Sequence, residues 1–121
     1  MLRFALITSV VLFAHVARSQ AEPPLKAGDL VTLECLSDRE GNRYLDGRTG
    51  DGTVGLAEKT GGEFTGTKWK VHDRGDGKVQ LECRGDVEGP RWLEGVRGDA
   101  TVQLTRDRER SGTHWKAKKV E

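Results

Sequence analysis

The sequence lacks an excess of charge of either sign. It has 20 basic and 19 acidic residues, and the two kinds are interleaved along the whole chain. A protein that follows the phosphate backbone of a nucleic acid needs a stripe of Lys and Arg. The absence of such a stripe predicts that nucleic acid is not a partner.

The sequence also lacks a second long apolar run. The only one, Phe4 to Ala17, follows Arg3 and is too short for a membrane span of roughly 20 residues, but it has the length of a signal-peptide core. Small residues at Ala17 and Ser19 favour cleavage after Ser19, and cleavage after Ala21 is the alternative. We therefore expect residues 1–19 to be a signal peptide and the protein to be secreted and extracellular, without membrane insertion.

Removing residues 1–19 takes away Arg3 and Arg18, which are two of the 20 basic residues, and none of the 19 acidic ones, so the net charge becomes −1. Residues 20–27, with Pro23 and Pro24, are expected to form an N-terminal linker. Residues 28–121 are enough for one domain with one modest core.

Residues that could support catalysis are scarce. Outside the leader there are two histidines, His72 and His114, and two serines, Ser37 and Ser111. No spacing couples them as nucleophile and base, and no cysteine and histidine spacing is typical of a metal site. We expect no enzyme activity, no cofactor and no metal.

What the chain does contain is an internal repeat. Ten residues recur 48 positions later, and four more recur 46 positions later, after a two-residue deletion. The first set is Val31, Leu33, Glu34, Cys35, Gly41, Arg43, Leu45, Gly47, Val54 and Leu56, and the second is Gly66, Thr67, Trp69 and Lys70. This pattern indicates a tandem duplication, with repeats at 28–75 and 76–121.

Each repeat is predicted to form four short strands. Val31, Leu33 and Cys35 alternate with polar residues, which is the period of a strand with one apolar face. The other strands of the first repeat are expected around 43–45, 53–56 and 68–71. Glycine and aspartate fill the gaps, as in turns. The fold class is therefore all-β with about eight strands and one shared core, formed by Val31, Leu33, Val54, Leu56, Trp69, Val79, Leu81, Val102, Leu104 and Trp115.

The order of "RYLDG", a V-x-L strand and a closing "GT-x-W" resembles the repeat of fascin-like and ricin-like β-trefoils. The resemblance implies a four-stranded lobe that ends on a buried tryptophan. A trefoil has three such lobes and this chain has two. The Gln-x-Trp signature of ricin-type sugar binding is absent, because Thr67-Lys68-Trp69 and Thr113-His114-Trp115 stand in its place, so sugar binding does not follow from the resemblance.

Two lobes must still cover their apolar faces and strand edges. Either the strands form a small barrel or sandwich with pseudo-twofold symmetry, or several chains associate to supply the missing lobe. We favour the first because it needs no partner.

Two aromatic residues at matching repeat positions are each followed by an acid two residues later: Tyr44 by Asp46, and Trp92 by Glu94. An aromatic face beside a carboxylate suits a sugar ring, whose C–H face stacks while its hydroxyls bond to the acid. These four residues are the ligand-binding candidates. The alternative is that the aromatic rings cap the core with a polar rim.

Cys35 and Cys83 are the only cysteines, and they occupy equivalent positions. An oxidising compartment favours a disulfide, but a bridge requires Cα atoms within about 7 Å. An intrachain bridge and two buried free thiols are equally compatible with the sequence, and an interchain bridge is a further alternative.

The tripeptide Arg-Gly-Asp occurs three times and could serve a cell-adhesion receptor, or it could be turn chemistry only. We expect the first copy to be the most accessible, because it lies in the link between repeats, whereas the second directly follows a strand and the third is confined between two paired strands. The adhesion candidates are Arg74, Gly75, Asp76, Arg84, Gly85, Asp86, Arg97, Gly98 and Asp99.

The sequence thus favours a secreted, non-enzymatic extracellular binding or matrix module, with an extracellular glycan or matrix component as partner. The alternative is an adhesion ligand or secreted effector that binds a cell-surface receptor.

Overall fold

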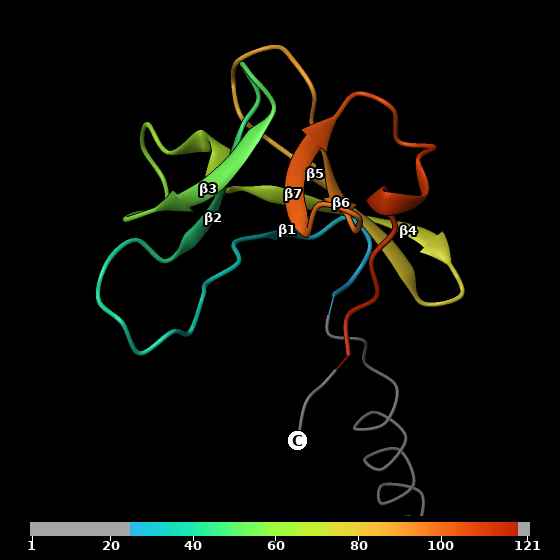
Figure 1. Ribbon diagram of the computed structural model, residues 1–121, viewed down its shortest axis with the longest axis horizontal. Helices are drawn as coiled ribbons and strands as arrows, with labels where there is room; N and C mark the ends of the chain where they lie inside the picture. The colour runs from blue at the N-terminus through green and yellow to red at the C-terminus, as the bar shows by residue number, and fades with distance from the viewer. Residues whose placement is uncertain (1–24, 119–121) are drawn as a thin grey trace, which may run out of the picture.

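The computed structural model describes residues 25–118, which fold into strands and turns without an α-helix (Figure 1). The expected signal peptide lies outside the described residues. The elements in this range are β1 (Leu30–Val31), β2 (Tyr44–Arg48), β3 (Thr53–Ala57), β4 (Trp69–Gly75), β5 (Lys78–Cys83), β6 (Trp92–Val96) and β7 (Thr101–Thr105), with 3-10 turns η1 (Thr65–Thr67) and η2 (Ser111–Thr113). The all-β prediction is confirmed. No helix in 25–118 could cross a membrane.

Five strands form one sheet in the order β1-β4-β5-β6-β7, and every pairing is antiparallel. The β4–β5 hairpin is the longest pairing and has a register shift between Asp73 and Gly75. By contrast, β5 and β6 share only the pair Glu82 and Trp92. The sheet is therefore well bonded within the β4–β5 and β6–β7 hairpins and weakly joined between β5 and β6.

The hairpin of β2 and β3 forms a separate two-stranded sheet. Its turn is joined to the larger sheet, because the Leu104 amide donates a 2.8 Å hydrogen bond to the Gly52 carbonyl. In Figure 1 this hairpin stands beside β7, and β3 contacts β7.

The core lies around Trp69, whose side chain is fully buried and whose Nε1 donates to the Leu45 carbonyl at 3.1 Å. Its buried neighbours are Val71, Val79, Leu81, Cys83, Leu93 and Leu104. Of the predicted core residues, Trp69, Val79, Leu81 and Leu104 are buried, while Val31, Leu33, Val54 and Trp115 are partly buried against this cluster. Leu25, in the expected linker, also packs against it.

Two of the predicted core residues are exposed. Leu56 is 41% and Val102 is 43% exposed. Val102 lies next to the β6–β7 turn, and the residue opposite it is Gly95, which has no side chain to cover it. Leu56 belongs to β3, whose only strand partner is β2. The apolar alternation predicted that both side chains lie on the core-facing side of their strands. At these two points that side is left exposed to solvent.

The strands of the described residues do not close into a barrel, so the barrel alternative is wrong. Residues 25–118 form seven strands, where about eight were predicted. The first expected strand ends at Val31 and continues only as an isolated bridge between Glu34 and Tyr44, and the last is reduced to a bridge between Val79 and Trp115. These segments lie at the edges, where each has a neighbour on one side only.

Several contacts occur in both halves of the domain. Leu45 pairs with Leu56, and Leu93 pairs with Leu104. Trp115 Nε1 donates to the Leu93 carbonyl at 2.9 Å, as Trp69 Nε1 does to Leu45. The hydroxyls of Thr67 and Thr113, both fully buried, donate to Phe64 and Arg110 carbonyls at 2.7 Å.

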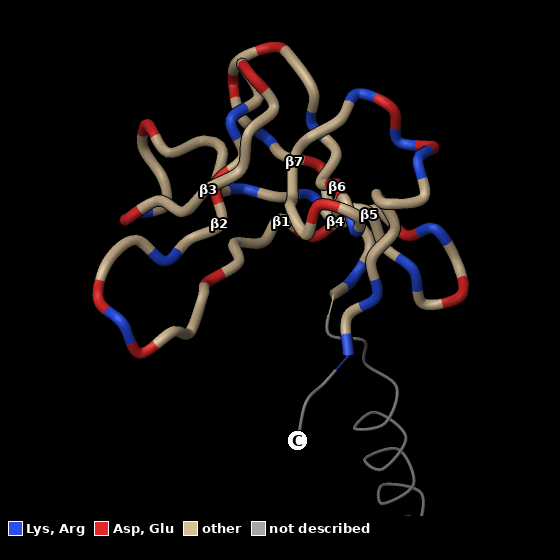
Figure 2. The backbone as a smooth tube through the Cα atoms, in the orientation of Figure 1, with Lys and Arg blue, Asp and Glu red and all other residues tan. Residues whose placement is uncertain are grey.

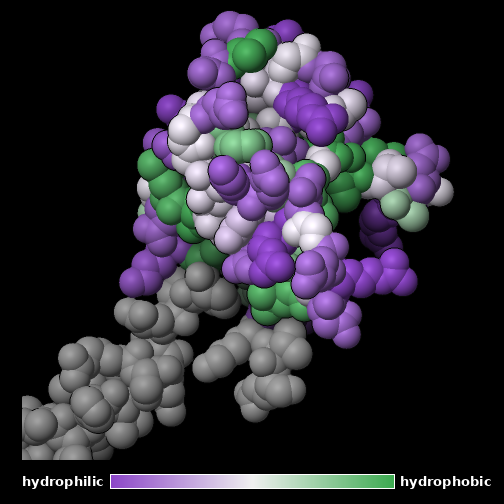
Figure 3. Space-filling view, turned by 90° about the vertical axis from the view of Figure 1, so that its left-hand side faces the viewer, coloured by the Kyte–Doolittle hydropathy of each residue, from purple (hydrophilic) through white to green (hydrophobic). Residues whose placement is uncertain are grey.

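The charged residues are spread over the loops on all sides, with both signs mixed (Figure 2). The space-filling view shows a largely hydrophilic surface interrupted by separate hydrophobic patches (Figure 3). The large hydrophobic residues that are most exposed are Leu30, Leu36, Leu56, Val87 and Val102.

Candidate polar pocket

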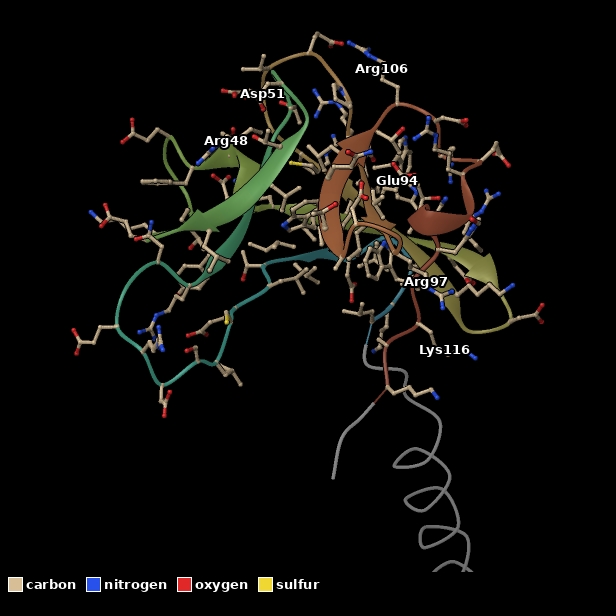
Figure 4. The ribbon with its side chains drawn as sticks, viewed as in Figure 1. Arg48, Asp51, Glu94, Arg97, Arg106 and Lys116 are labelled. Atoms are coloured by element: carbon tan, nitrogen blue, oxygen red, sulfur yellow. The ribbon has the colours of Figure 1, made fainter. Side chains whose placement is uncertain are left out.

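A pocket lies in the second half of the domain, between β6, the turn that follows it and η2. Its volume is about 790 Å³. Its lining includes Glu94, Gln103, Arg110, His114 and Trp115, and the exposed Arg97 and Asp99 stand at its rim. Glu94 and Arg97 come from β6 and from the start of its turn (Figure 4). One of the four predicted ligand-binding residues, Glu94, is therefore in this pocket.

Glu94 is the most buried charged group of the pocket. Its side chain is 9% exposed. Its Oε1 accepts a 2.9 Å hydrogen bond from Gln103 Nε2 and lies 3.3 Å from Arg110 Nη1. The Arg110 side chain is 55% exposed, so its remaining N–H donors face solvent. A carboxylate, a guanidinium and an amide thus form one connected polar array.

The local structure explains this array. Glu94 and Gln103 are directly opposite each other on β6 and β7, and cross-strand neighbours are close enough to interact. Arg110 immediately precedes η2, which packs on β6. The array therefore depends on the β6–β7 register and on the position of η2.

The indole of Trp115 provides the apolar part of the pocket wall. It packs over Gly95, where an added Cβ would lie 3.1 Å from the ring carbon Cη2. Its Nε1 is held by the Leu93 carbonyl, so the ring is fixed in place. Aromatic surface next to the Glu94 array gives the pocket one apolar and one polar side.

The corresponding place in the first half carries different side chains. Gly55 stands opposite Asp46 where Gln103 stands opposite Glu94. Phe64 precedes η1 where Arg110 precedes η2. The polar array is thus specific to the second half.

Trp92 does not present a free aromatic face. The guanidinium of Arg108 lies 4.3 Å from its ring centroid, and His72 contacts it edge-on at 5.0 Å between centroids. Gln80 Oε1 in turn accepts hydrogen bonds from Arg108 at 3.0 and 3.2 Å. The Trp92 ring is therefore part of a packed polar cluster.

Tyr44 and Asp46 lie on β2, in the smaller sheet, and both are half-buried. The structure does not bring them together with Trp92 and Glu94, which lie on β6 in the larger sheet. The four candidates therefore do not form one site.

The two cysteines are free and differ in exposure: Cys35 is exposed and Cys83 is buried. Cys83 Sγ lies 3.4 Å and 3.5 Å from the Gly66 and Gly47 carbonyls. Burial raises the pKa of the Cys83 thiol. The expectation that Cys35 faces inward like its counterpart is wrong, because its segment leaves the sheet after Val31.

Among the histidines, His72 Nε2 lies 2.9 Å from Glu82 Oε1. Burial opposes ionisation of Glu82, but the hydrogen bond from His72 and the charge of Arg84 outweigh it, so the pKa of Glu82 lies below its ordinary value. This pair holds β4 to β5, where the two residues come from adjacent strands.

The first Arg-Gly-Asp copy lies at the exposed β4–β5 turn, in the link between the two repeats. Arg74 and Gly75 belong to β4, and the tip is Asp76-Gly77, with positive φ at both residues. Arg74 Nη2 lies 3.7 Å from Glu109 Oε1. The sequence predicted that the third copy, unlike the first, is confined between two paired strands. That prediction is wrong, because both copies lie at β-hairpin turns.

In the second copy both charged side chains have partners. Arg84 Nη1 is 3.3 Å from Glu82 Oε1, and Asp86 Oδ1 accepts a 3.0 Å hydrogen bond from Thr65 Oγ1. The third copy forms the β6–β7 turn, and Arg97, Gly98 and Asp99 are all exposed.

Sequence reasoning missed Gln103, Arg110 and Trp115 as pocket residues. The signal was present in the repeat register, where Gln103 replaces Gly55 and Arg110 replaces Phe64. Polar residues stand in the second half at positions where the first half has glycine and phenylalanine, and this difference could have been read from the sequence.

No protein-family model matches the chain, and no curated protein matches it. Within residues 25–118 no group of His, Cys, Asp and Glu is arranged to hold a metal ion.

Proposed function

We propose that the protein is a secreted, non-enzymatic extracellular binding module that takes a neutral, hydroxyl-rich saccharide in the pocket of its second half. The observation that carries the proposal is the hydrogen-bonded array of Glu94, Gln103 and Arg110 beside the ring of Trp115. Sugar hydroxyls both donate and accept hydrogen bonds. A carboxylate accepts, a guanidinium donates and an amide does both.

The charge of the pocket favours a neutral ligand. Arg110 and Glu94 form an ion pair, and the rim carries Arg97 and Asp99, one of each sign. A phosphate or sulfate group would find no excess of positive charge here. The aromatic wall adds a surface on which the C–H face of a sugar ring can pack.

The finer description of the fold is part of the same proposal. We infer that each half is one lobe of β-trefoil type and that the two lobes arose by tandem duplication. The equivalent indole hydrogen bonds of Trp69 and Trp115, and the equivalent buried threonines before them, support this. The first lobe would then supply the scaffold and the second the binding site.

A glycan array tests the function, with wild type, Glu94→Gln and the matched variant Asp46→Asn probed in parallel. We expect wild type and Asp46→Asn to bind the same neutral glycans. Glu94→Gln should bind them about 10- to 100-fold more weakly, because a hydrogen bond to a charged group contributes roughly 1.5–3 kcal/mol. Binding that Glu94→Gln retains and Asp46→Asn loses would move the site to the first half, and no binding by wild type would reject the proposal.

A further inference from the structure

The β6–β7 turn carries an Arg-Gly-Asp tripeptide whose two charged side chains are both free. Arg97 and Asp99 are exposed, and neither side chain has a hydrogen bond or ion pair with any residue in 25–118. An added Cβ at Gly98 would meet nothing within 4 Å, so the middle of the turn is also open. This inference does not rest on the saccharide pocket.

The backbone closes this turn without using the Asp99 carboxylate. The Asp99 amide donates to the Val96 carbonyl at 3.1 Å, and the Ala100 amide donates to the Arg97 carbonyl at 3.3 Å. Ala100 adopts a left-handed conformation with φ +56°. Main-chain atoms therefore fix the turn, and the two charged side chains project from a defined position.

In the equivalent turn of the first half, the aspartate carboxylate already accepts hydrogen bonds from a neighbouring residue. Asp51 Oδ1 accepts hydrogen bonds from the Thr53 amide at 3.0 Å and from Thr53 Oγ1 at 2.7 Å. The side-chain hydrogen bond from Thr53, more than any other contact, lowers the pKa of Asp51. Asp99 stands at the same repeat position but makes no such bond, so its carboxylate is available to another molecule.

The other two copies are less available. Asp86 is bonded to Thr65 and Arg84 pairs with Glu82. In the first copy Asp76 is exposed and free, but Arg74 pairs with Glu109. Only the copy at 97–99 offers a free cation and a free anion together.

We propose that Arg97-Gly98-Asp99 binds a cell-surface receptor that holds a divalent cation beside an acidic pocket. A carboxylate is the ligand that Mg²⁺ and Ca²⁺ prefer in proteins, so Asp99 completes the coordination of the receptor's cation. The Arg97 guanidinium pairs with carboxylates of the receptor pocket. Gly98 places no side chain between them, so the middle of the turn does not obstruct either group.

Attachment of fibroblasts to the immobilised protein tests this inference, with Mg²⁺ and Mn²⁺ present and again with EDTA. We expect attachment that EDTA removes and that a soluble Gly-Arg-Gly-Asp-Ser peptide competes away. Asp99→Glu keeps the charge but moves it by one methylene, and attachment should fall to the level of an uncoated surface. Arg97→Ala should cause the same loss, because it removes the guanidinium that pairs with the receptor, and circular dichroism spectra that match wild type show that both variants are folded.

Asp76→Glu and Asp86→Glu are the matched controls and should attach cells as wild type does. The inference is overturned if wild type does not attach cells, or if attachment survives EDTA. It is also overturned if Asp99→Glu and Arg97→Ala attach cells normally, or if Asp76→Glu or Asp86→Glu abolishes attachment in the way expected of Asp99→Glu.

Discussion

At the scale of single residues, the two cysteines show how far equivalent positions can differ. Cys83 lies on β5 between two neighbouring strands, and Cys35 lies beyond the end of β1. Burial raises the pKa of Cys83, so less of the reactive thiolate is present at a given pH, and reagents cannot reach it.

Alkylation with iodoacetamide should therefore label one thiol in the native protein, at Cys35, and both in urea. Peptide mass spectrometry identifies the labelled residue. Labelling of neither cysteine before reduction would indicate a disulfide, and equal labelling of both in the native state would contradict the burial of Cys83.

Glu82 is a partly buried residue whose ionisation contributes to stability. Its pKa is lower in the folded protein than the ordinary value of 4.5, so its ionised form stabilises the fold above about that pH. This contribution is lost as the pH falls through the lower, folded-state pKa.

The free energy of unfolding of wild type should exceed that of Glu82→Gln by about 1 kcal/mol at pH 7. The difference should shrink below pH 4.5, the ordinary glutamate value. Urea denaturation at several pH values measures it. Glu109→Gln is the control, because Glu109 is 72% exposed and surface pairs contribute little. A difference that does not change between pH 7 and pH 3 would contradict the role of the charge.

At the scale of elements, Trp69 and Trp115 make equivalent indole hydrogen bonds in the two halves, but of these two only Trp69 is fully buried. Trp69 is fully buried on β4, while Trp115 is half-buried at an isolated bridge. The cost of removing a buried side chain grows with the cavity that remains.

Trp69→Ala should lower the free energy of unfolding by about 3–5 kcal/mol, which is most of the stability of so small a domain. Trp115→Ala should cost less, because part of its ring already contacts water. Chemical denaturation of both variants gives the comparison. A larger loss for Trp115→Ala than for Trp69→Ala would contradict the described burial.

The sequence predicted the hairpins β2–β3 and β6–β7 well because apolar alternation and Gly-Asp turns are local signals. It predicted β1 poorly. Val31 to Cys35 has the same alternation as Val79 to Cys83, but the second segment lies between β4 and β6 and the first at an edge. The length of each strand depends here on whether other strands lie beside it, and the whole fold determines which strands lie side by side.

At the scale of the whole molecule, the two halves have a similar pattern of contacts but different surfaces. Leu81, Leu104 and Cys83 are buried in the second half, and their counterparts Leu33, Leu56 and Cys35 are more exposed in the first. A repeat in the sequence predicts equivalent strands, but it does not predict which of two equivalent residues is buried.

The same reason limits prediction of the pocket. Glu94 was found because an acid near an aromatic residue is visible in the sequence. Arg110 was not, because it is 16 positions away and reaches Glu94 only when η2 packs on β6. The aromatic residue expected to join Glu94 was Trp92, yet the one in the pocket is Trp115.

The most direct test of the proposed saccharide site is an NMR titration that follows the indole N–H signals of Trp69, Trp92 and Trp115, the three tryptophans of the chain. The titrant is the neutral glycan that binds best on the array. We predict that the Trp115 signal shifts progressively to saturation while the Trp69 signal, which belongs to a fully buried ring, stays in place. Saturating binding that shifts Trp92 and leaves Trp115 unchanged would contradict a saccharide site at Glu94, Gln103 and Arg110.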